Sequence, residues 1–151
     1  SVAVAYDSRD DSYFSYTQEA LPELFQRLHD ADLVVGYNSF RFDYSVLQPF
    51  APWDMRDLPG LDLLQRVTER LHYRLSLNNL GQATLNAPKS ADGMQALRWW
   101  QEGRLEDIAA YCRMDVDITR RLYLYGLEHG YLLFTNKQGA CVRVPVDFKT
   151  S

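Results

Sequence analysis

A short polar segment follows an apolar stretch in the first third of the sequence. In "LVVGYNSFRFDYSVL", residues 33–47, the apolar run stops at Gly36, and Asn38 and Asp43 follow where the next helix is expected to begin. Two interpretations fit these residues. In the structural one, Asn38 stabilises a turn and Asp43 caps the helix or favours its N-terminal dipole. In the chemical one, Asp43 is an oxygen ligand for a divalent metal ion at the end of a sheet.

A second pair of residues fits the chemical interpretation. Tyr111 and Asp115, in "YCRMD", are four residues apart on an expected helix, so they share one face. A phenol and a carboxylate on one face can share a metal-bound water. The spacing alone is weak, because chance gives about one Tyr-x-x-x-Asp pair in a chain of this composition; Tyr6 and Asp10 form another, in an expected hairpin. The three histidines have no metal-like spacing, which argues against a zinc site.

The elements that must position these side chains alternate between strands and helices in the first half and are mainly helical in the second. We expect strands at 1–7, 12–16, 33–37 and 58–64, and a closing hairpin at 131–136 and 140–148. We expect helices at 21–30, 42–48, 63–72, 76–85, 93–103 and 105–129, the last capped by Gly130. This order predicts an α/β or mixed α+β domain, in which sites form where a strand ends and a helix begins.

Composition narrows the class of protein. A chain of 151 residues, 46% of them hydrophobic, suits one folded domain. The two cysteines indicate reduced thiols in a cytoplasmic protein, and no apolar run reaches the roughly 20 residues that span a membrane. The net charge of −4 argues against bulk, non-specific nucleic-acid binding. An acidic first part precedes a basic second part, which fits either a carboxylate site beside a basic surface or random scatter. Trp99, Trp100 and Leu105 are expected in the core.

The order of the motifs carries more information than any one of them. A strand, Gly-Tyr-Asn-x-x-x-Phe-Asp, then "LDLL", "SLNNLG" and "GRLEDIAAYCRMD" together resemble the DEDD superfamily of 3′–5′ exonucleases, which have a ribonuclease-H-like fold. The resemblance runs from about residue 1 to 148 and is to the tyrosine-bearing branch, and within it to a bacterial predicted-exonuclease group sometimes found beside helicase domains. It implies that Asp43 and Asp115 bind Mg²⁺ or Mn²⁺, that Tyr111 orients the attacking water, and that Asn38 supports the motif at the substrate.

The sequence departs from this family in one motif. The family carries an Asp-x-Glu on its first strand, and no aspartate here is followed two residues later by glutamate. The opening "SVAVAYD" is similar to the family's second strand. Asp7 and Asp10 lie in a turn, and Asp115 and Asp117 point about 200° apart around a helix axis, so neither pair is a convincing replacement. We therefore expect a ribonuclease-H-like mixed sheet, flanked by helices, that lacks the family's first strand. Residues 1–151 would then be a single domain truncated at its N-terminus.

The remaining residues leave alternatives open. Lys89 and Ser90 in "APKSADGMQ" precede an expected helix and either hold a substrate phosphate or form an ordinary cap and loop. Asp62 in "LDLL" is either a helix-leading acid, which is the favoured interpretation, or a sheet-end residue near the site. The leading hypothesis is a metal-dependent 3′–5′ exonuclease domain acting on a single-stranded DNA or RNA 3′ end, inactive or impaired as this chain stands. The alternatives are an inactive module that binds nucleic acid or a helicase partner, and a hydrolase of small nucleotides.

Overall fold

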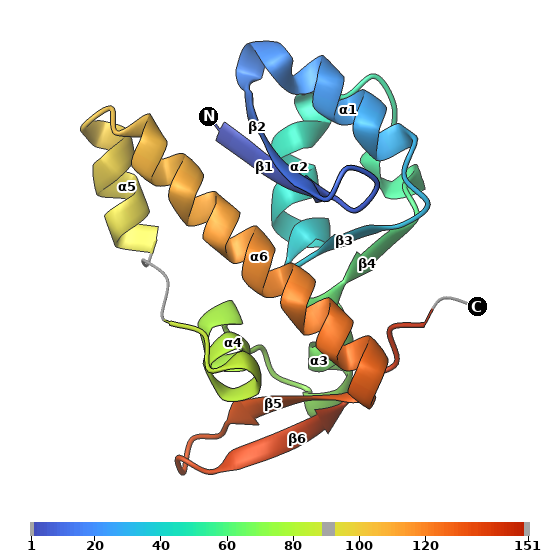
Figure 1. Ribbon diagram of the computed structural model, residues 1–151, viewed down its shortest axis with the longest axis vertical. Coiled ribbons are helices and arrows are strands. Elements are labelled where there is room, and N and C mark those ends of the chain that lie inside the picture. Colours follow the sequence, from blue (N-terminus) through green and yellow to red (C-terminus); the bar gives the residue numbers. More distant parts are fainter. Residues whose placement is uncertain (1, 89–92, 150–151) are drawn as a thin grey trace.

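The computed structural model describes residues 2–88 and 93–149 and has the mixed α/β architecture that the sequence predicts (Figure 1). Its strands form three pairs. β1 (Val2–Asp7) and β2 (Ser12–Thr17) make an antiparallel hairpin, and β5 (Tyr131–Thr135) and β6 (Cys141–Pro145) make another. Between them in sequence, β3 (Val34–Gly36) and β4 (Gly60–Asp62) pair in parallel. Within the described residues, the strands therefore form three separate two-stranded sheets, two antiparallel and one parallel.

The helices follow the sequence expectations closely. They are α1 (Leu21–His29), α2 (Tyr44–Leu47), α3 (Leu63–Leu71), α4 (Leu77–Leu85), α5 (Gly93–Gln101) and α6 (Leu105–His129). Short 3-10 turns lie at Gln18–Ala20, Gln48–Phe50 and Met55–Asp57. Gly130 ends α6 with a φ of 77°, so its predicted capping role is confirmed.

One segment differs from the expected helix at 42–48. Ser39–Asp43 forms a π-helical turn, and regular α-helix begins only at Tyr44. The turn follows Asn38, whose φ of 60° lies in the left-handed region. Asparagine adopts this conformation more readily than most residues. The chain therefore changes direction at Asn38 before it becomes helical, and Asp43 is the last residue of the turn.

The long helix α6 supports the other elements. It runs diagonally across the molecule in Figure 1 and packs against β1, β3, β5, α4 and α5. One buried cluster lies where α6 meets α4 and the β5–β6 hairpin, and it includes Leu80, Ile118, Leu122, Leu132, Val144 and Phe148. A second cluster lies between α1, α2 and the β1–β2 hairpin, and it includes Tyr16, Leu24, Phe25, Tyr44 and Met55. The first buried cluster contacts both candidate segments, through Tyr37 of segment 36–43 and Met114 of segment 111–115, while Phe40 packs against the second cluster.

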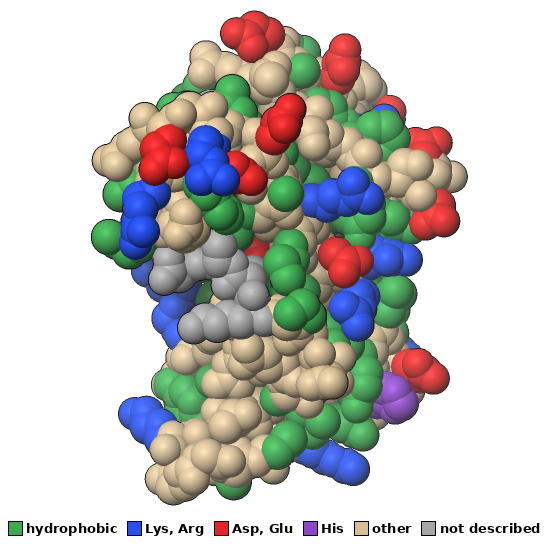
Figure 2. Space-filling view, turned by 60° about the vertical axis from the view of Figure 1, so that its left-hand side comes forward, with side chains coloured by type: hydrophobic (Ala, Val, Ile, Leu, Met, Phe, Trp, Pro, Cys, Tyr) green, Lys and Arg blue, Asp and Glu red, His purple; other side chains and the backbone are tan. Residues whose placement is uncertain are grey.

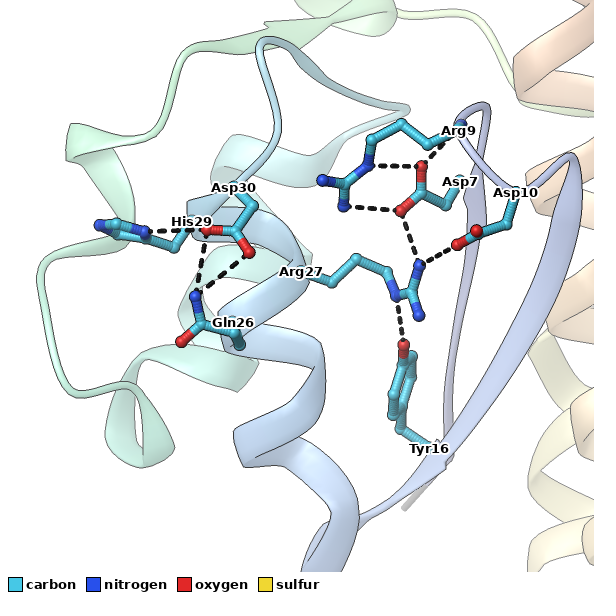
Figure 3. A network of polar contacts seen from close by, with 8 residues as sticks. All are labelled: Asp7, Arg9, Asp10, Tyr16, Gln26, Arg27, His29 and Asp30. Atoms are coloured by element: carbon cyan, nitrogen blue, oxygen red, sulfur yellow. Dashed lines mark hydrogen bonds and ion pairs between the residues drawn. The ribbon is translucent and has the colours of Figure 1, made fainter.

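A polar network holds α1 against the first hairpin (Figure 3). The Arg27 guanidinium donates to Asp7 at 2.7 Å, to Asp10 at 2.9 Å and to the Tyr16 hydroxyl at 2.9 Å. Asp7 also accepts two hydrogen bonds from the Arg9 side chain. These contacts from Arg9 and Arg27 hold the pKa of the Asp7 carboxyl well below its usual range. Asp7 and Asp10 are thus both occupied by arginines.

The surface corrects one expectation about the core. Trp100 is 51% exposed because α5 packs mainly against α6 and leaves its other face open, and Leu105, the first residue of α6, is 48% exposed. In Figure 2, most acidic side chains of the face shown lie in its upper half, with basic side chains among them. None of the described helices is both long and apolar enough to cross a membrane. Lys89 and Ser90 lie outside the described residues.

Candidate functional site

The site begins where the parallel strands β3 and β4 end together. Gly36, the last residue of β3, pairs with Asp62, the last residue of β4. The chain then turns so tightly that a Cβ atom on Gly36 would lie 2.5 Å from the Ser39 Cβ atom. Only glycine fits this approach without a shift of the turn. The carboxyl ends of the two strands thus place Asn38, Asp43 and Asp62 in one region.

Asp62 holds this region together. Its side chain is almost fully enclosed, with 3% of the residue exposed. Its carboxylate accepts from the backbone N–H groups of Asn38 at 2.8 Å and Phe40 at 3.2 Å, and from that of Leu64 at 3.0 Å. The bond to Leu64 confirms the expectation of an acid that leads a helix. The other two bonds reach across to the turn after β3.

Asp43 does not cap the helix that follows it. It is the residue before α2, and its side chain makes no capping hydrogen bond, so the capping interpretation is wrong for this residue. The residue is exposed at the surface, but the protein around its carboxyl group displaces part of the water that would otherwise solvate the charge. Burial, and secondarily the nearby Asp62 carboxylate, raise the pKa of Asp43 to about 6. A carboxyl with such a pKa gains from a cation bound beside it.

Tyr44, next to Asp43, has an unusual environment. The residue is 7% exposed, and its hydroxyl has no hydrogen-bond partner among the described residues. Burial and the carboxylates of Asp62 and Asp43 raise the pKa of Tyr44 to about 12. Its hydroxyl also lies against Gly60, where an added Cβ atom would be 2.9 Å away. The phenol therefore stays protonated, with its hydroxyl beside Gly60.

The α6 helix carries the second pair of candidates, and one of them, Asp115, acts electrostatically on the same thiol as Asp43. Cys112 lies between Tyr111 and Asp115 on α6 and is half-buried. The pKa of its thiol depends on the carboxylates around it. Burial raises the pKa of this thiol, and the carboxylates of Asp115 and Asp43 raise it further. Asp43 and Asp115 therefore both lie within electrostatic range of a single sulfur atom, although 72 residues separate them in the sequence. The Tyr111 ring packs edge-on against Trp99, with 6.4 Å between ring centroids.

Asn38 has a partner that the sequence did not indicate. Its side-chain oxygen accepts a hydrogen bond of 3.0 Å from Arg74, which lies between α3 and α4. Arg74 is exposed, and no carboxylate of the described residues forms an ion pair with it. A guanidinium has five N–H donors, so most of them stay available beside the turn. Two residues therefore hold the turn. Asp62 accepts from backbone N–H groups of the turn, and Arg74 donates to the Asn38 side chain.

The candidate ligands are of the chemical type that binds a hard divalent cation, but there are too few of them to complete a site. Asp43 and Asp115 supply carboxylate oxygens of the type that Mg²⁺ and Mn²⁺ prefer. Within residues 2–88 and 93–149, however, no three His, Cys, Asp or Glu side chains are grouped closely enough to hold a metal ion. Asp7 and Asp10 cannot complete the set, because Arg27 binds both of them.

Sequence reasoning placed Asn38 and Asp43 at this strand end, and put Tyr111 and Asp115 on one helix. It underestimated Asp62 and missed Arg74 and Tyr44. The signal for Asp62 was present in principle, since the carboxyl ends of two neighbouring parallel strands meet at one edge of a sheet. Arg74 left no such signal, because its contact with Asn38 spans 36 residues of intervening chain.

Comparison with known proteins gives one match. The sequence matches the RNase H superfamily over residues 4–125, a segment that runs from β1 into the last turns of α6 and contains every described candidate residue. No curated protein and no solved structure matches the chain significantly. The match covers most of the chain, and the chain therefore belongs to the RNase H superfamily.

Proposed function

From membership in the RNase H superfamily, a group of nuclease-type domains that act on nucleic acid, we propose a narrower function for this chain. It is a metal-dependent exonuclease domain that removes nucleotides from a 3′ end. The observation that carries the proposal is that the carboxylates of Asp43, from the turn after β3, and Asp115, from α6, both act electrostatically on the Cys112 thiol. The fields of two carboxylates from separate elements overlap at this thiol, which favours a shared cation over two independent structural roles.

The proposed roles follow from the chemistry of phosphodiester hydrolysis. Divalent ions, when bound, activate the attacking water and neutralise charge at the leaving oxygen. Asp43 and Asp115 would hold such ions, Mg²⁺ or Mn²⁺, through their carboxylate oxygens. Tyr111, one helical turn before Asp115, would orient the water through its phenol. Asn38 would contact the substrate or hold the turn, and Lys89 and Ser90 would bind a substrate phosphate.

Full activity needs more carboxylates than the described residues bring together. Exonucleases of the DEDD type, which the sequence resembles, carry two further acids on a strand in the middle of the sheet. Here β1 pairs only with β2 and β3 only with β4 within the described residues, while α6 packs against both β1 and β3. A further strand paired with β1 or β3 would satisfy an open edge and carry acids towards the site. We therefore expect the 151-residue chain to cut poorly by itself.

The test is degradation of a single-stranded oligonucleotide in the presence of Mn²⁺. The protein in its natural full length and the 151-residue chain are each assayed with a 5′-labelled and a 3′-labelled substrate. We expect the full-length protein to give a shortening ladder from the 5′ label and a released mononucleotide from the 3′ label. Asp43→Ala should abolish both products. The control is Asp32→Ala, which changes an exposed aspartate before β3, at the end of the strand opposite to Asp43.

Retention of cutting in Asp43→Ala, or internal cleavage without end-shortening, would refute the proposal. A second candidate function is supported by the absence of a three-ligand group among the described residues. It is an inactive module that binds nucleic acid or a helicase partner. Such a module would bind the oligonucleotide without Mn²⁺, and its affinity would fall steeply with salt, as expected for phosphate contacts. Binding of this kind, with no cutting by either form of the protein, would favour the module.

A further inference from the structure

The carboxylate of Asp62 makes more contacts than a helix cap requires. A capping aspartate typically accepts one or two N–H groups from the first turn of its own helix. Asp62 meets this need through Leu64, at 3.0 Å. Its other two donors, the N–H groups of Asn38 and Phe40, belong to the turn after β3 and lie more than 20 residues earlier in the sequence.

The two carboxylate oxygens of Asp62 accept from different N–H groups. Oδ1 accepts from Asn38 and from Leu64, and Oδ2 accepts from Phe40. Because each oxygen faces N–H donors and the residue is 3% exposed, Asp62 cannot turn towards a cation without losing these bonds. Asp62 therefore differs from Asp43, which stands open to solvent in the same region.

The bonds of Asp62 determine where the π-helical turn starts. Asn38 has a left-handed backbone, and its carbonyl oxygen accepts from the Phe42 N–H at 3.0 Å as the first bond of the turn. With the N–H groups of Asn38 and Phe40 both fixed to Asp62, the beginning of the turn is tied to the end of β4. Asp43 ends the same turn, so its place follows from that of Asn38.

We propose that Asp62 is a positioning residue. Its carboxylate holds the backbone N–H groups of Asn38 and Phe40 and thereby places the Asp43 carboxylate at the nuclease site. The proposal rests on the function proposed above for Asp43. It assigns to Asp62 no contact with substrate or metal. It also explains why an acid is needed there, since a carboxylate alone offers two oxygens for three N–H donors.

Two variants separate this role from simple helix capping. In Asp62→Ser the hydroxyl can still cap α3 at Leu64 but is too short to reach across to Asn38 and Phe40. Asp62→Asn is the milder second variant, because it keeps one oxygen and directs an NH₂ group at the Phe40 N–H. The control is Ser76→Ala, which removes the cap of α4, where the Ser76 hydroxyl accepts from the Asn79 N–H at 3.0 Å. This control weakens a helix end through a side chain whose hydrogen bond lies at the start of α4 and leaves the bonds of Asp62 in place.

The first readout is amide hydrogen exchange followed by NMR, which does not depend on activity. We expect exchange at Asn38 and Phe40 to speed up at least tenfold in Asp62→Ser, and at Phe40 in Asp62→Asn. Exchange at Leu64 should change much less in both variants. The Ser76→Ala control should leave the turn as it is in the wild type. Unchanged exchange at Asn38 and Phe40 in Asp62→Ser would show that Asp62 merely caps α3 and would overturn the proposal.

The second readout follows Mn²⁺. Paramagnetic broadening of the Asp43 and Asp115 amide signals should need at least tenfold more Mn²⁺ in Asp62→Ser than in the wild type or in Ser76→Ala. In the full-length protein, kcat should fall at least tenfold while KM for the oligonucleotide stays near its wild-type value. A wild-type Mn²⁺ response in a variant whose turn exchanges rapidly would overturn the positioning role. Absence of any Mn²⁺ effect in the wild type would instead refute the proposed function, and amide exchange would still decide whether Asp62 holds the turn.

Discussion

The carboxyl of Asp43 offers a sharp test of the site, because it is predicted to weaken the fold when it is charged. Its pKa rises from a usual 3.8 to about 6, mainly through burial and partly through Asp62. The protonated form is thus favoured in the folded state. This preference for the protonated carboxyl stabilises the folded state over the unfolded state. The stabilisation is fully present below the unfolded pKa near 4 and is lost as the pH rises through about 6. Replacement by the neutral amide in Asp43→Asn should remove this loss.

The size of the effect follows from the pKa change and the exposure of the residue. A shift from 3.8 to about 6 corresponds to about 3 kcal/mol if no water reaches the charge. Asp43 is exposed, so solvent screens the carboxylate and reduces this figure. We expect Asp43→Asn to raise the free energy of unfolding by about 1 kcal/mol above pH 7 and by almost nothing at pH 4.

The assay is urea unfolding, followed by tryptophan fluorescence, at intervals between pH 4 and pH 8. The wild type, Asp43→Asn and the control Asp32→Asn are compared, with a chelator present to remove divalent ions. Addition of Mn²⁺ at pH 7.5 should then stabilise the wild type and leave Asp43→Asn unchanged, because ligand binding favours the folded state. A gain in Asp43→Asn that is the same at pH 4 and pH 8, or a loss of stability at neutral pH, would refute the reasoning.

Three further changes test the packing that supports the site. Gly126→Ala should lower the free energy of unfolding by about 2 kcal/mol or more, because its Cβ atom would lie 2.3 Å from the ring of Phe148, which is 1% exposed; thermal unfolding that is unchanged would contradict this packing. Arg27→Ala should cost about 1–2 kcal/mol at pH 7, measured by urea unfolding. This cost should shrink below pH 4, since the stabilisation from a carboxyl with a lowered pKa, here Asp7, is full above its unfolded pKa near 4 and is lost as the pH falls towards the lower folded pKa; a constant cost down to pH 2 would argue against the ion pair. Ser76→Ala should cost about 1 kcal/mol through the lost cap of α4, and a stability equal to the wild type would show that this cap contributes nothing.

Most of the secondary structure could be predicted from the sequence because its signals are local. Apolar residues at helical spacing gave α1, α3 and α6 to within about a turn, and Gly130 ended α6 for the conformational reason expected. The π-helical turn could not be predicted in this way. It depends on the left-handed Asn38 and on bonds to Asp62, and Asp62 comes from another strand.

In the candidate site, too, local features could be predicted from the sequence, whereas contacts between distant residues could not. The order of motifs in the sequence indicated an exonuclease-like chain, and the match to the RNase H superfamily confirms the broader nuclease class. Sequence spacing also determined that Tyr111 and Asp115 share a helix face, because four residues make about one helical turn. The roles of these residues in metal binding and catalysis stay a prediction until they are tested.

Tertiary structure alone decided which side chains meet. It placed Asp43 and Asp115 where both carboxylates act electrostatically on one thiol, gave Asp62 three backbone donors and occupied Asp7 and Asp10 with Arg27. It also left Trp100 on the surface, because α5 packs mainly against α6. The physical reason is one of range: helix and strand preferences act over a few neighbouring residues, whereas pKa values, buried hydrogen bonds and exposure depend on groups that only the folded chain brings into contact.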